Sequence, residues 1–195
     1  MPFNLPIFLT WLRILAIPLL ILVFNLPPSW LTPLERNLFA TLLFIAAALT
    51  DWLDGFLARR LNQTSAFGAF LDPVADKLIV AAALFMLVEL DRTNAAVAVI
   101  IIGREITISA LREWMAKIGA AKSVAVSMIG KIKTTAQMIA IILLLYGAPI
   151  PILGWSTLAI GNVLIWVAAL LTLWSMGYYL HKAWPEIARR SASTS

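Results

Sequence analysis

The chain of 195 residues contains no cysteine, a single histidine and few charged side chains. The absence of cysteine excludes a disulfide framework and thiol chemistry. Charged residues make up 13% of the chain and hydrophobic residues 62%, whereas a soluble domain carries about 25% charged residues. Such a chain has too little polar surface to cover itself in water. The composition therefore predicts an integral membrane protein.

Apolar windows of about 20 residues predict membrane-spanning helices. They lie near residues 5–26, 35–58, 70–90, 94–116, 124–147 and 156–181. Six spans place both termini on the same side of the membrane. We therefore predict an all-α integral membrane protein with six transmembrane helices. The helices form one domain over residues 1–185, and a disordered cytoplasmic tail follows over residues 186–195.

Lysine and arginine are distributed unevenly over the ends of these spans. Arg59 and Arg60 follow the second span, and most other basic residues surround the turn between the fourth and fifth spans or follow the sixth. The opposite face holds only Arg36 and Arg92. Because cytoplasmic loops carry the excess of basic residues, we expect both termini and residues 51–77 to be cytoplasmic. The net charge of +5 thus indicates topology rather than nucleic-acid binding.

Four aspartates lie in segment 51–77, although long apolar runs flank it. Asp51 and Asp54 are three residues apart at the end of the second span, and Asp72 and Asp76 are four apart where the third begins. Residues at these spacings share one helix face. A short hairpin joins the two spans, so we expect the faces to converge. Pro73 suits the first position of a helix, which predicts that Asp72 lies near a helix cap.

Four carboxylates in one small volume repel one another, and burial in a bilayer makes the repulsion worse. Lys77 cannot bridge all four of them, whereas divalent metal ions can. Oxygen ligands without histidine or cysteine favour Mg²⁺, Mn²⁺ or Ca²⁺ over Zn²⁺. Four carboxylates suit a two-metal site that clamps a phosphoryl group. Solvated aspartates at helix ends are the alternative, but two spaced pairs on the arms of one hairpin argue against it.

Two further residues of the same segment fit a phosphate ligand. Gly55 lets a bulky phosphate approach the backbone closely, and Arg59 can bind a diphosphate oxygen through two hydrogen bonds. Gly68 fits close packing between helices. Gly55 and Arg59 extend the candidate site from a metal centre to a site for a metal-bound diphosphate.

The segment from Asp51 to Asp76 reads D-x2-D-G-x2-A-R-x8-G-x3-D-x3-D. This pattern resembles the signature of the CDP-alcohol phosphotransferases, without a departure. Within that family, the chain most resembles the bacterial phosphatidylglycerophosphate synthases. The supporting segments are FNLPIFLTWLRILAIP near the N-terminus, which contains Asn4, Thr10 and Arg13, GREITISALREW at 103–114, and GKIKTTAQ at 130–137.

The resemblance implies transfer of a phosphatidyl group from CDP-diacylglycerol to sn-glycerol 3-phosphate, giving phosphatidylglycerophosphate and CMP. It implies that two divalent cations, Mg²⁺ or Mn²⁺, are held by Asp51, Asp54, Asp72 and Asp76. Asp76 would also be the general base, unless the metal itself acidifies the hydroxyl. Gly55, Arg59 and Gly68 would contact CDP-diacylglycerol. The resemblance further implies a homodimer in the bacterial cytoplasmic (inner) membrane, with its active site facing the cytoplasm.

The phosphate of the acceptor needs cations of its own. Arg104 and Arg112 are about 80° apart around a helix, and Arg104 lies in an apolar run where an unpaired arginine is expensive. The adjacent Glu105 projects about 100° away, so we expect a phosphate to be the better partner. Lys131 completes the predicted pocket in preference to Lys133, about 200° away from it on the helix. Membrane anchoring by basic residues is the alternative.

Three other functions are compatible with parts of the pattern. The first is the same chemistry with serine, inositol, inositol phosphate or phosphatidylglycerol as acceptor, and the basic residues argue against serine and free inositol. The second is a membrane prenyltransferase, whose aspartate motifs are spaced differently. The third is a divalent-cation transporter, whose ion site usually lies near the bilayer midplane in repeated halves. We also expect small residues such as Gly161 and Ala168 to be available for packing against a second copy.

Overall fold

The fold consists of α-helices. The computed structural model describes residues 5–61, 66–119, 128–149, 154 and 156–192, apart from the side chains of 5, 6, 52, 54–59, 61, 66, 128–132, 186, 187 and 189–192. The described backbone forms six helices and no strand: α1 (Leu5–Asn25), α2 (Pro33–Leu61), α3 (Ala66–Glu89), α4 (Ala95–Lys117), α5 (Met128–Tyr146) and α6 (Thr157–Ala192). The predicted all-α class is confirmed.

Local sequence signals explain where two of the helices begin. At α2, the Thr32 hydroxyl accepts a hydrogen bond from Glu35 N, and Glu35 Oε2 accepts one from Thr32 N. This reciprocal pair is a capping box, with Pro33 as the first helical residue. At α4, the Asn94 side chain accepts a hydrogen bond of 2.8 Å from Ala96 N. Both caps satisfy backbone donors that a helix start leaves without partners.

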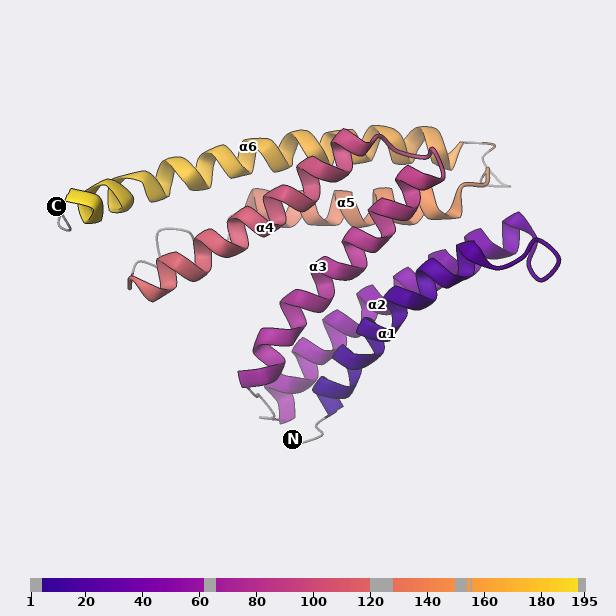
Figure 1. The fold of residues 1–195 in the computed structure, drawn as a ribbon, viewed down its shortest axis with the longest axis horizontal. Coiled ribbons are helices and arrows are strands. Elements are labelled where there is room, and N and C mark those ends of the chain that lie inside the picture. The colour runs from indigo at the N-terminus through magenta and orange to yellow at the C-terminus, as the bar shows by residue number, and fades with distance from the viewer. Residues whose placement is uncertain (1–4, 62–65, 120–127, 150–153, 155, 193–195) are drawn as a thin grey trace.

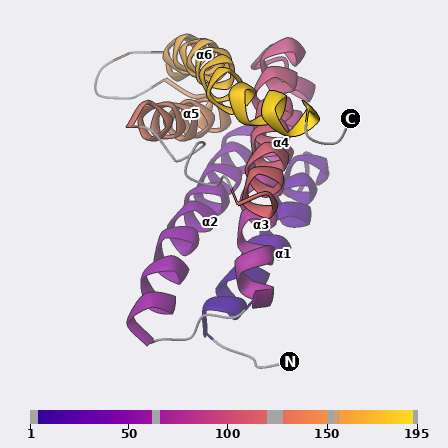
Figure 2. The same cartoon turned by 90° about the vertical axis from the view of Figure 1, so that its left-hand side faces the viewer.

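The six helices lie in two groups. In Figures 1 and 2, α1, α2 and α3 run beside one another, while α5 and α6 lie side by side above them. The helix α4 lies between these groups in sequence and contacts both α3 and α6. The starts of α1 and α3 and the end of α2 lie at the same end of the bundle (Figure 1). This arrangement brings the aspartate-bearing ends of α2 and α3 next to the start of α1.

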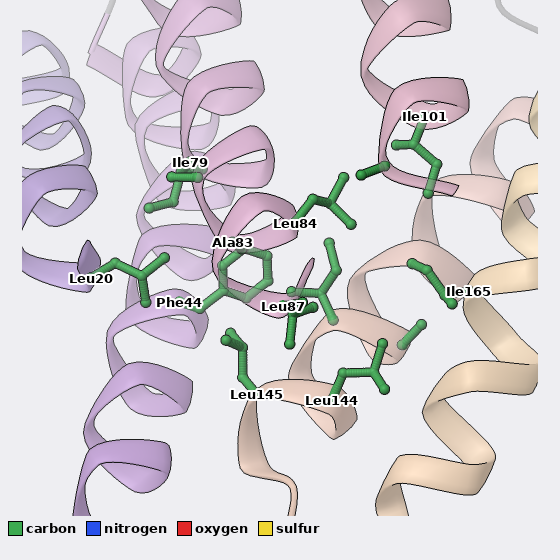
Figure 3. Close-up of a cluster of buried hydrophobic side chains, with 14 of the residues drawn as sticks. Leu20, Phe44, Ile79, Ala83, Leu84, Leu87, Ile101, Leu144, Leu145 and Ile165 are labelled. Carbon is green, nitrogen blue, oxygen red and sulfur yellow. The ribbon is translucent and has the colours of Figure 1, made fainter. Parts of the chain in front are cut away.

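A cluster of buried side chains joins all six helices. Its members include Leu20, Phe44, Leu84, Leu87, Ile101, Leu144 and Ile165, and none of these seven exposes more than 1% of its surface. Figure 3 shows these side chains pointing toward one another between the helices. Because each helix contributes to the same cluster, the functional side chains described below are attached to one packed framework.

The predicted spans agree with the observed helices to within a few residues, except at the end of α6. Three of the described helices contain a segment long and apolar enough to cross a membrane: Ile7–Asn25, Pro33–Asp51 and Thr157–Pro185. A shorter apolar segment, Lys133–Tyr146, lies in α5. The helices α3 and α4 carry several ionisable residues within their apolar runs, which lowers their hydropathy.

Two helix boundaries differ from the sequence prediction. The helix α6 continues to Ala192, so residues 186–192 are helical rather than disordered, and 193–195 lie outside the described residues. Polar residues such as glutamate and arginine are good helix formers, and a helix does not end where its apolar residues end. The helix α3 begins at Ala66. Pro73 is therefore inside the helix, and the predicted cap at Asp72 is wrong.

Gly161 and Ala168 of α6 face the interior of the chain. A Cβ atom at Gly161 would lie 2.8 Å from Leu144 Cγ of α5, and Ala168 is fully buried. Gly161 thus allows α5 and α6 to approach closely. The expectation that Gly161 and Ala168 are available for a second copy is therefore wrong.

Candidate active site

Arg13 of α1 lies at the centre of the acidic site. Its side chain is fully buried, and its Nη1 lies 3.3 Å from Asp51 Oδ1 of α2. The same nitrogen forms an ion pair with Asp76 Oδ1 of α3. One guanidinium nitrogen thus joins carboxylates from two other helices, as convergence of the two aspartate pairs requires.

A second contact between α1 and α3 lies one helical turn away. The Thr10 hydroxyl donates a hydrogen bond to Asp72 Oδ1. Thr10 precedes Arg13 by three residues, and Asp72 precedes Asp76 by four, so each pair shares one helix face. The two contacts fix the rotation of α3 against α1 and direct both of its aspartates toward α1.

The structure thus brings two of the four predicted metal ligands, Asp51 and Asp76, to one arginine nitrogen. Asp72, bound by Thr10, lies one helical turn from Asp76 on α3. The side chains of Asp54, Gly55 and Arg59 lie outside the described residues, and Gly68 is buried in the first turn of α3. Among the described side chains, which omit Asp54, no group of three acidic or histidine residues forms a metal site by itself.

The acidic site has the chemistry that a hard divalent cation requires. Asp51 and Asp76 already point at one cationic nitrogen, while 49% and 40% of their side-chain surfaces remain exposed. Their ligand atoms are carboxylate oxygens, which suit Mg²⁺ or Mn²⁺ better than Zn²⁺. The described residues therefore fit a divalent cation at Asp51 and Asp76, and Asp72 lies one helical turn from Asp76 on α3.

A cavity of about 610 Å³ adjoins the acidic site. Arg13, Asp51 and Asp76 line it together with Glu105 of α4 and Gln137 of α5. Much of the remaining lining is apolar and includes Ala47, Ala48, Ile79, Ile101, Ile102 and Met138. The cavity therefore connects the acids of α2 and α3 with a polar wall on α4 and α5, between apolar sides.

Glu105 is the point where this cavity meets a cluster of basic residues. Its Oε1 accepts hydrogen bonds of 2.8 Å from both Arg104 Nη1 and Lys133 Nζ. Arg104 and Lys133 are buried, and Arg104 Nη2 also donates to Ser175 Oγ at 3.3 Å. The expectation that Glu105 is a poor partner for Arg104 is wrong, because both side chains are long enough to bend toward one another from adjacent positions.

Arg112 joins the cluster through an aromatic ring. Its guanidinium carbon lies 5.4 Å from the ring centroid of Tyr179 on α6, and that of Arg104 lies 6.0 Å from the same centroid. No described carboxylate forms an ion pair with Arg112. Arg104 and Arg112 thus contact the same ring, and Glu105 rather than either arginine lines the cavity.

The predicted choice of Lys131 over Lys133 stays a prediction, since the side chain of Lys131 lies outside the described residues. The structure places Lys133 in the cluster. Arg104, Arg112 and Lys133 together carry three positive charges against the single carboxylate of Glu105. An excess of positive charge in a largely buried cluster is typical of a site for an anion, such as a phosphate group.

Sequence reasoning assigned no role to Thr10, Arg13 or Tyr179. Arg13 has a recognisable signal: it lies inside an apolar run, where an arginine needs a partner. The same argument selected Arg104. Tyr179 carries no such signal, because a buried tyrosine near the end of an apolar helix is an ordinary core residue.

Comparison with known proteins identifies the family of this chain. The sequence profile of the CDP-alcohol phosphatidyltransferase family matches residues 3–174. The CDP-diacylglycerol–glycerol-3-phosphate 3-phosphatidyltransferases of Escherichia coli K12 and Shigella sonnei are each 52% identical over 185 residues, which cover 94% of this chain and 96% of the relative. The enzyme of that name from Shigella flexneri serotype 5b matches equally well. The chain belongs to the CDP-alcohol phosphatidyltransferase family.

Proposed function

We propose that the protein transfers the phosphatidyl group of CDP-diacylglycerol to sn-glycerol 3-phosphate, producing phosphatidylglycerophosphate and CMP. Relatives that share 52% identity over most of both chains carry the name of this activity. The observation that carries the proposal is the convergence of Asp51 and Asp76 on one cationic nitrogen. The cavity there also reaches Glu105 and, behind it, the basic cluster.

The acidic site holds two divalent cations, Mg²⁺ or Mn²⁺, through Asp51, Asp54, Asp72 and Asp76. When bound, such ions neutralise the diphosphate of the donor and stabilise charge on the departing CMP. Arg13 holds Asp51 and Asp76 in place, and Thr10 holds Asp72. Gly55, Arg59 and Gly68 bind the CDP portion of the donor.

The reaction proceeds by attack of the 1-hydroxyl of glycerol 3-phosphate on the phosphorus that carries the lipid. The new P–O bond forms as the bond to CMP breaks, and CMP leaves with that electron pair. Asp76 accepts the hydroxyl proton, since it lines the cavity and part of its carboxylate remains exposed. Positioning of the two anionic substrates supplies a further part of the rate enhancement.

The basic cluster binds the phosphate of the acceptor. Arg104, Arg112 and a lysine of α5, either Lys131 or Lys133, provide charge-assisted hydrogen-bond donors. Glu105 neutralises one positive charge of the cluster, and the substrate phosphate neutralises the rest. A serine or inositol acceptor has no phosphate and would leave this positive charge uncompensated.

The six helices cross the bacterial inner membrane, with both termini and the active site on the cytoplasmic side. The distribution of lysine and arginine supports this orientation. The cytoplasmic side, which carries most lysine and arginine residues, holds the ends of α2 and α4 and the starts of α3 and α5. The protein forms a homodimer, as the family resemblance implies. The dimer surface does not include Gly161 and Ala168 of α6, because both are buried.

An acceptor panel tests the proposed function. Purified protein in detergent receives CDP-diacylglycerol and Mg²⁺ with glycerol 3-phosphate, inositol phosphate, inositol, serine or phosphatidylglycerol, and CMP release is measured. We expect release with glycerol 3-phosphate to exceed the others at least tenfold, and to stop when the metal is chelated. Faster turnover with serine would contradict the acceptor assignment. Absence of CMP release with every acceptor, together with metal-ion transport in vesicles, would favour the transporter.

A further inference from the structure

Tyr179 of α6 is buried against two of the cations that the proposed function assigns to the acceptor phosphate. Only 1% of its surface is exposed. Its ring centroid lies 6.0 Å from the guanidinium carbon of Arg104 and 5.4 Å from that of Arg112. Cations at this distance from an aromatic face are attracted to its negative electrostatic potential. One ring therefore contacts both arginines.

The two arginines do not meet by virtue of their positions on α4. They are eight residues apart, so their Cα atoms are separated by about 12 Å along the helix axis. The ring of Tyr179 enters from another helix and contacts both guanidinium groups. Two like charges repel one another, and a negative aromatic face reduces that repulsion. The ring thus links two arginines whose Cα atoms lie two helical turns apart.

The remaining partners of the arginines leave positive charge for a ligand. Arg104 shares the single oxygen Oε1 of Glu105 with Lys133. Arg112 has no described carboxylate partner, while its guanidinium carbon lies 5.4 Å from the ring centroid of Tyr179. In addition, the buried Nε atoms of Arg104 and Arg112 lack hydrogen-bond acceptors in the described part of the chain. Orientation of Arg112 therefore depends on Tyr179 more than on any ion pair.

We infer that Tyr179 is a positioning residue for the acceptor phosphate: its ring holds Arg104 and Arg112 in one phosphate-binding arrangement. This inference rests on the proposed function and adds a residue to the acceptor side of that site.

A purely structural role for Tyr179 makes a different prediction. The residue also packs in a small buried cluster with Ile108, Met115 and Ala183. If it served only to join α4 and α6, its loss would lower stability and the amount of folded enzyme. It would leave the KM values of the folded enzyme unchanged for both substrates. The positioning role instead raises the KM for glycerol 3-phosphate selectively.

The test compares Tyr179 with its neighbour Tyr178. Tyr178 exposes 44% of its surface, and its ring contacts Lys182 at 4.8 Å. The variants are Tyr179→Leu, Tyr179→Met, Tyr179→Phe and the matched control Tyr178→Leu. For each, the thermal unfolding midpoint, kcat and the KM values for CDP-diacylglycerol and glycerol 3-phosphate are measured in the full-length protein with Mg²⁺.

We expect Tyr179→Leu and Tyr179→Met to raise the KM for glycerol 3-phosphate about tenfold, as loss of two cation–π contacts suggests. The KM for CDP-diacylglycerol should change less than twofold. Tyr179→Phe keeps the ring and should restore the KM to within about threefold of the native value. Tyr178→Leu should leave both KM values unchanged.

Three results would overturn the inference. The first is an equal rise in the KM values for both substrates. The second is an unchanged KM for glycerol 3-phosphate in folded Tyr179→Leu or Tyr179→Met. The third is failure of Tyr179→Leu and Tyr179→Met to fold while Tyr179→Phe folds. The last would assign Tyr179 to packing alone. Failure of the proposed function is distinguishable, because it appears in the native enzyme as absence of turnover with glycerol 3-phosphate.

Discussion

Two arginines of the bundle, Arg13 and Arg92, show how the same side chain serves different ends of the molecule. Arg13 is paired with Asp51 and Asp76, two charged groups that remain partly exposed beside a cavity. Arg92, in the connection between α3 and α4, binds neutral partners. Its Nη1 donates to the carbonyl oxygens of Leu144 and Leu145 at 3.0 and 2.7 Å, and its Nη2 donates to Asn37 Oδ1 at 2.8 Å.

The partners of Arg92 identify it as a structural residue. The last carbonyl groups of a helix lack partners within that helix, and Arg92 supplies donors to two of them at the end of α5. Burial without a compensating carboxylate lowers the pKa of Arg92. Gly147 has a φ of 61°, and a Cβ there would lie 2.8 Å from Arg92 Nη1. This contact fixes α5 against the α3–α4 connection.

Arg13 and Arg92 differ in what can replace them as the partner of the groups they bind. Carbonyl groups at the end of a helix have no alternative to Arg92 other than water. The carboxylates of Asp51 and Asp76 can exchange an arginine contact for a metal ion. Arg13 therefore keeps two repelling carboxylates together without occupying all of their surface. This distinction between a functional and a structural arginine can be tested by substitution of Arg13 and Arg92.

The largest expected effect follows from Asp76→Asn. The substitution removes a metal ligand and the proposed base while keeping the shape of the side chain. Loss of a general base alone lowers the rate by about 10²–10⁴-fold, and we expect a decrease in kcat of at least that size. The measurement is CMP release with CDP-diacylglycerol, glycerol 3-phosphate and Mg²⁺.

Asp91→Asn is the matched control for that substitution. Asp91 is exposed in the connection between α3 and α4, and its φ of 53° is a value that asparagine tolerates. The control should retain native activity. A kcat of Asp76→Asn above a tenth of the native value would remove Asp76 from the proposed chemistry.

Arg13→Met should have the next largest effect, and it sharpens the comparison with Arg92. The variant leaves Asp51 and Asp76 without their shared cation. Breaking a buried ion pair costs about 3–5 kcal/mol. Because the acids are partly exposed and solvent screens them, we expect a loss of roughly 1–3 kcal/mol of unfolding free energy. The thermal unfolding midpoint in detergent, with and without Mg²⁺, measures it.

Metal ions should restore part of the stability of Arg13→Met. A divalent cation neutralises the two carboxylates, so Mg²⁺ should raise the unfolding midpoint of this variant more than that of the native protein. Arg92→Met is the control, because its former partners are neutral and gain nothing from Mg²⁺. An equal effect of Mg²⁺ on both variants would contradict the assignment of Arg13 to the metal site.

The parts of this structure that could be predicted from sequence are those set by local periodicity. Apolar runs located the helices because a bilayer requires about 20 apolar residues per span. The spacings within Asp51–Asp54 and Asp72–Asp76 predicted shared helix faces, and the structure confirms the convergence of Asp51 with Asp76. The end of α6 could not be predicted in this way, because helical residues continue past the apolar stretch.

Contacts between residues far apart in the sequence could not be predicted from one sequence. Thr10 and Arg13 reach acids more than sixty positions away, and such pairs depend on how α1 packs against α3. Glu105 was misjudged because Cβ directions alone exclude contacts that long side chains can make. Tyr179 became recognisable only when packing placed its ring beside Arg104 and Arg112.

The smallest effect is expected from Arg92→Met, which tests the other half of the comparison. Loss of its hydrogen bonds leaves the carbonyls of Leu144 and Leu145 to water or unsatisfied, at a cost of about 1–2 kcal/mol in unfolding free energy. The folded enzyme should keep the native KM for both substrates, since Arg92 lies at the opposite end of the helices from the acids. Lys117→Met is the control, because Lys117 pairs with Glu113 while 70% and 69% of these side chains are exposed, and such surface pairs contribute little to stability. Selective loss of substrate affinity in Arg92→Met, without a lower unfolding midpoint, would show that partner chemistry does not separate structural from functional arginines in this protein.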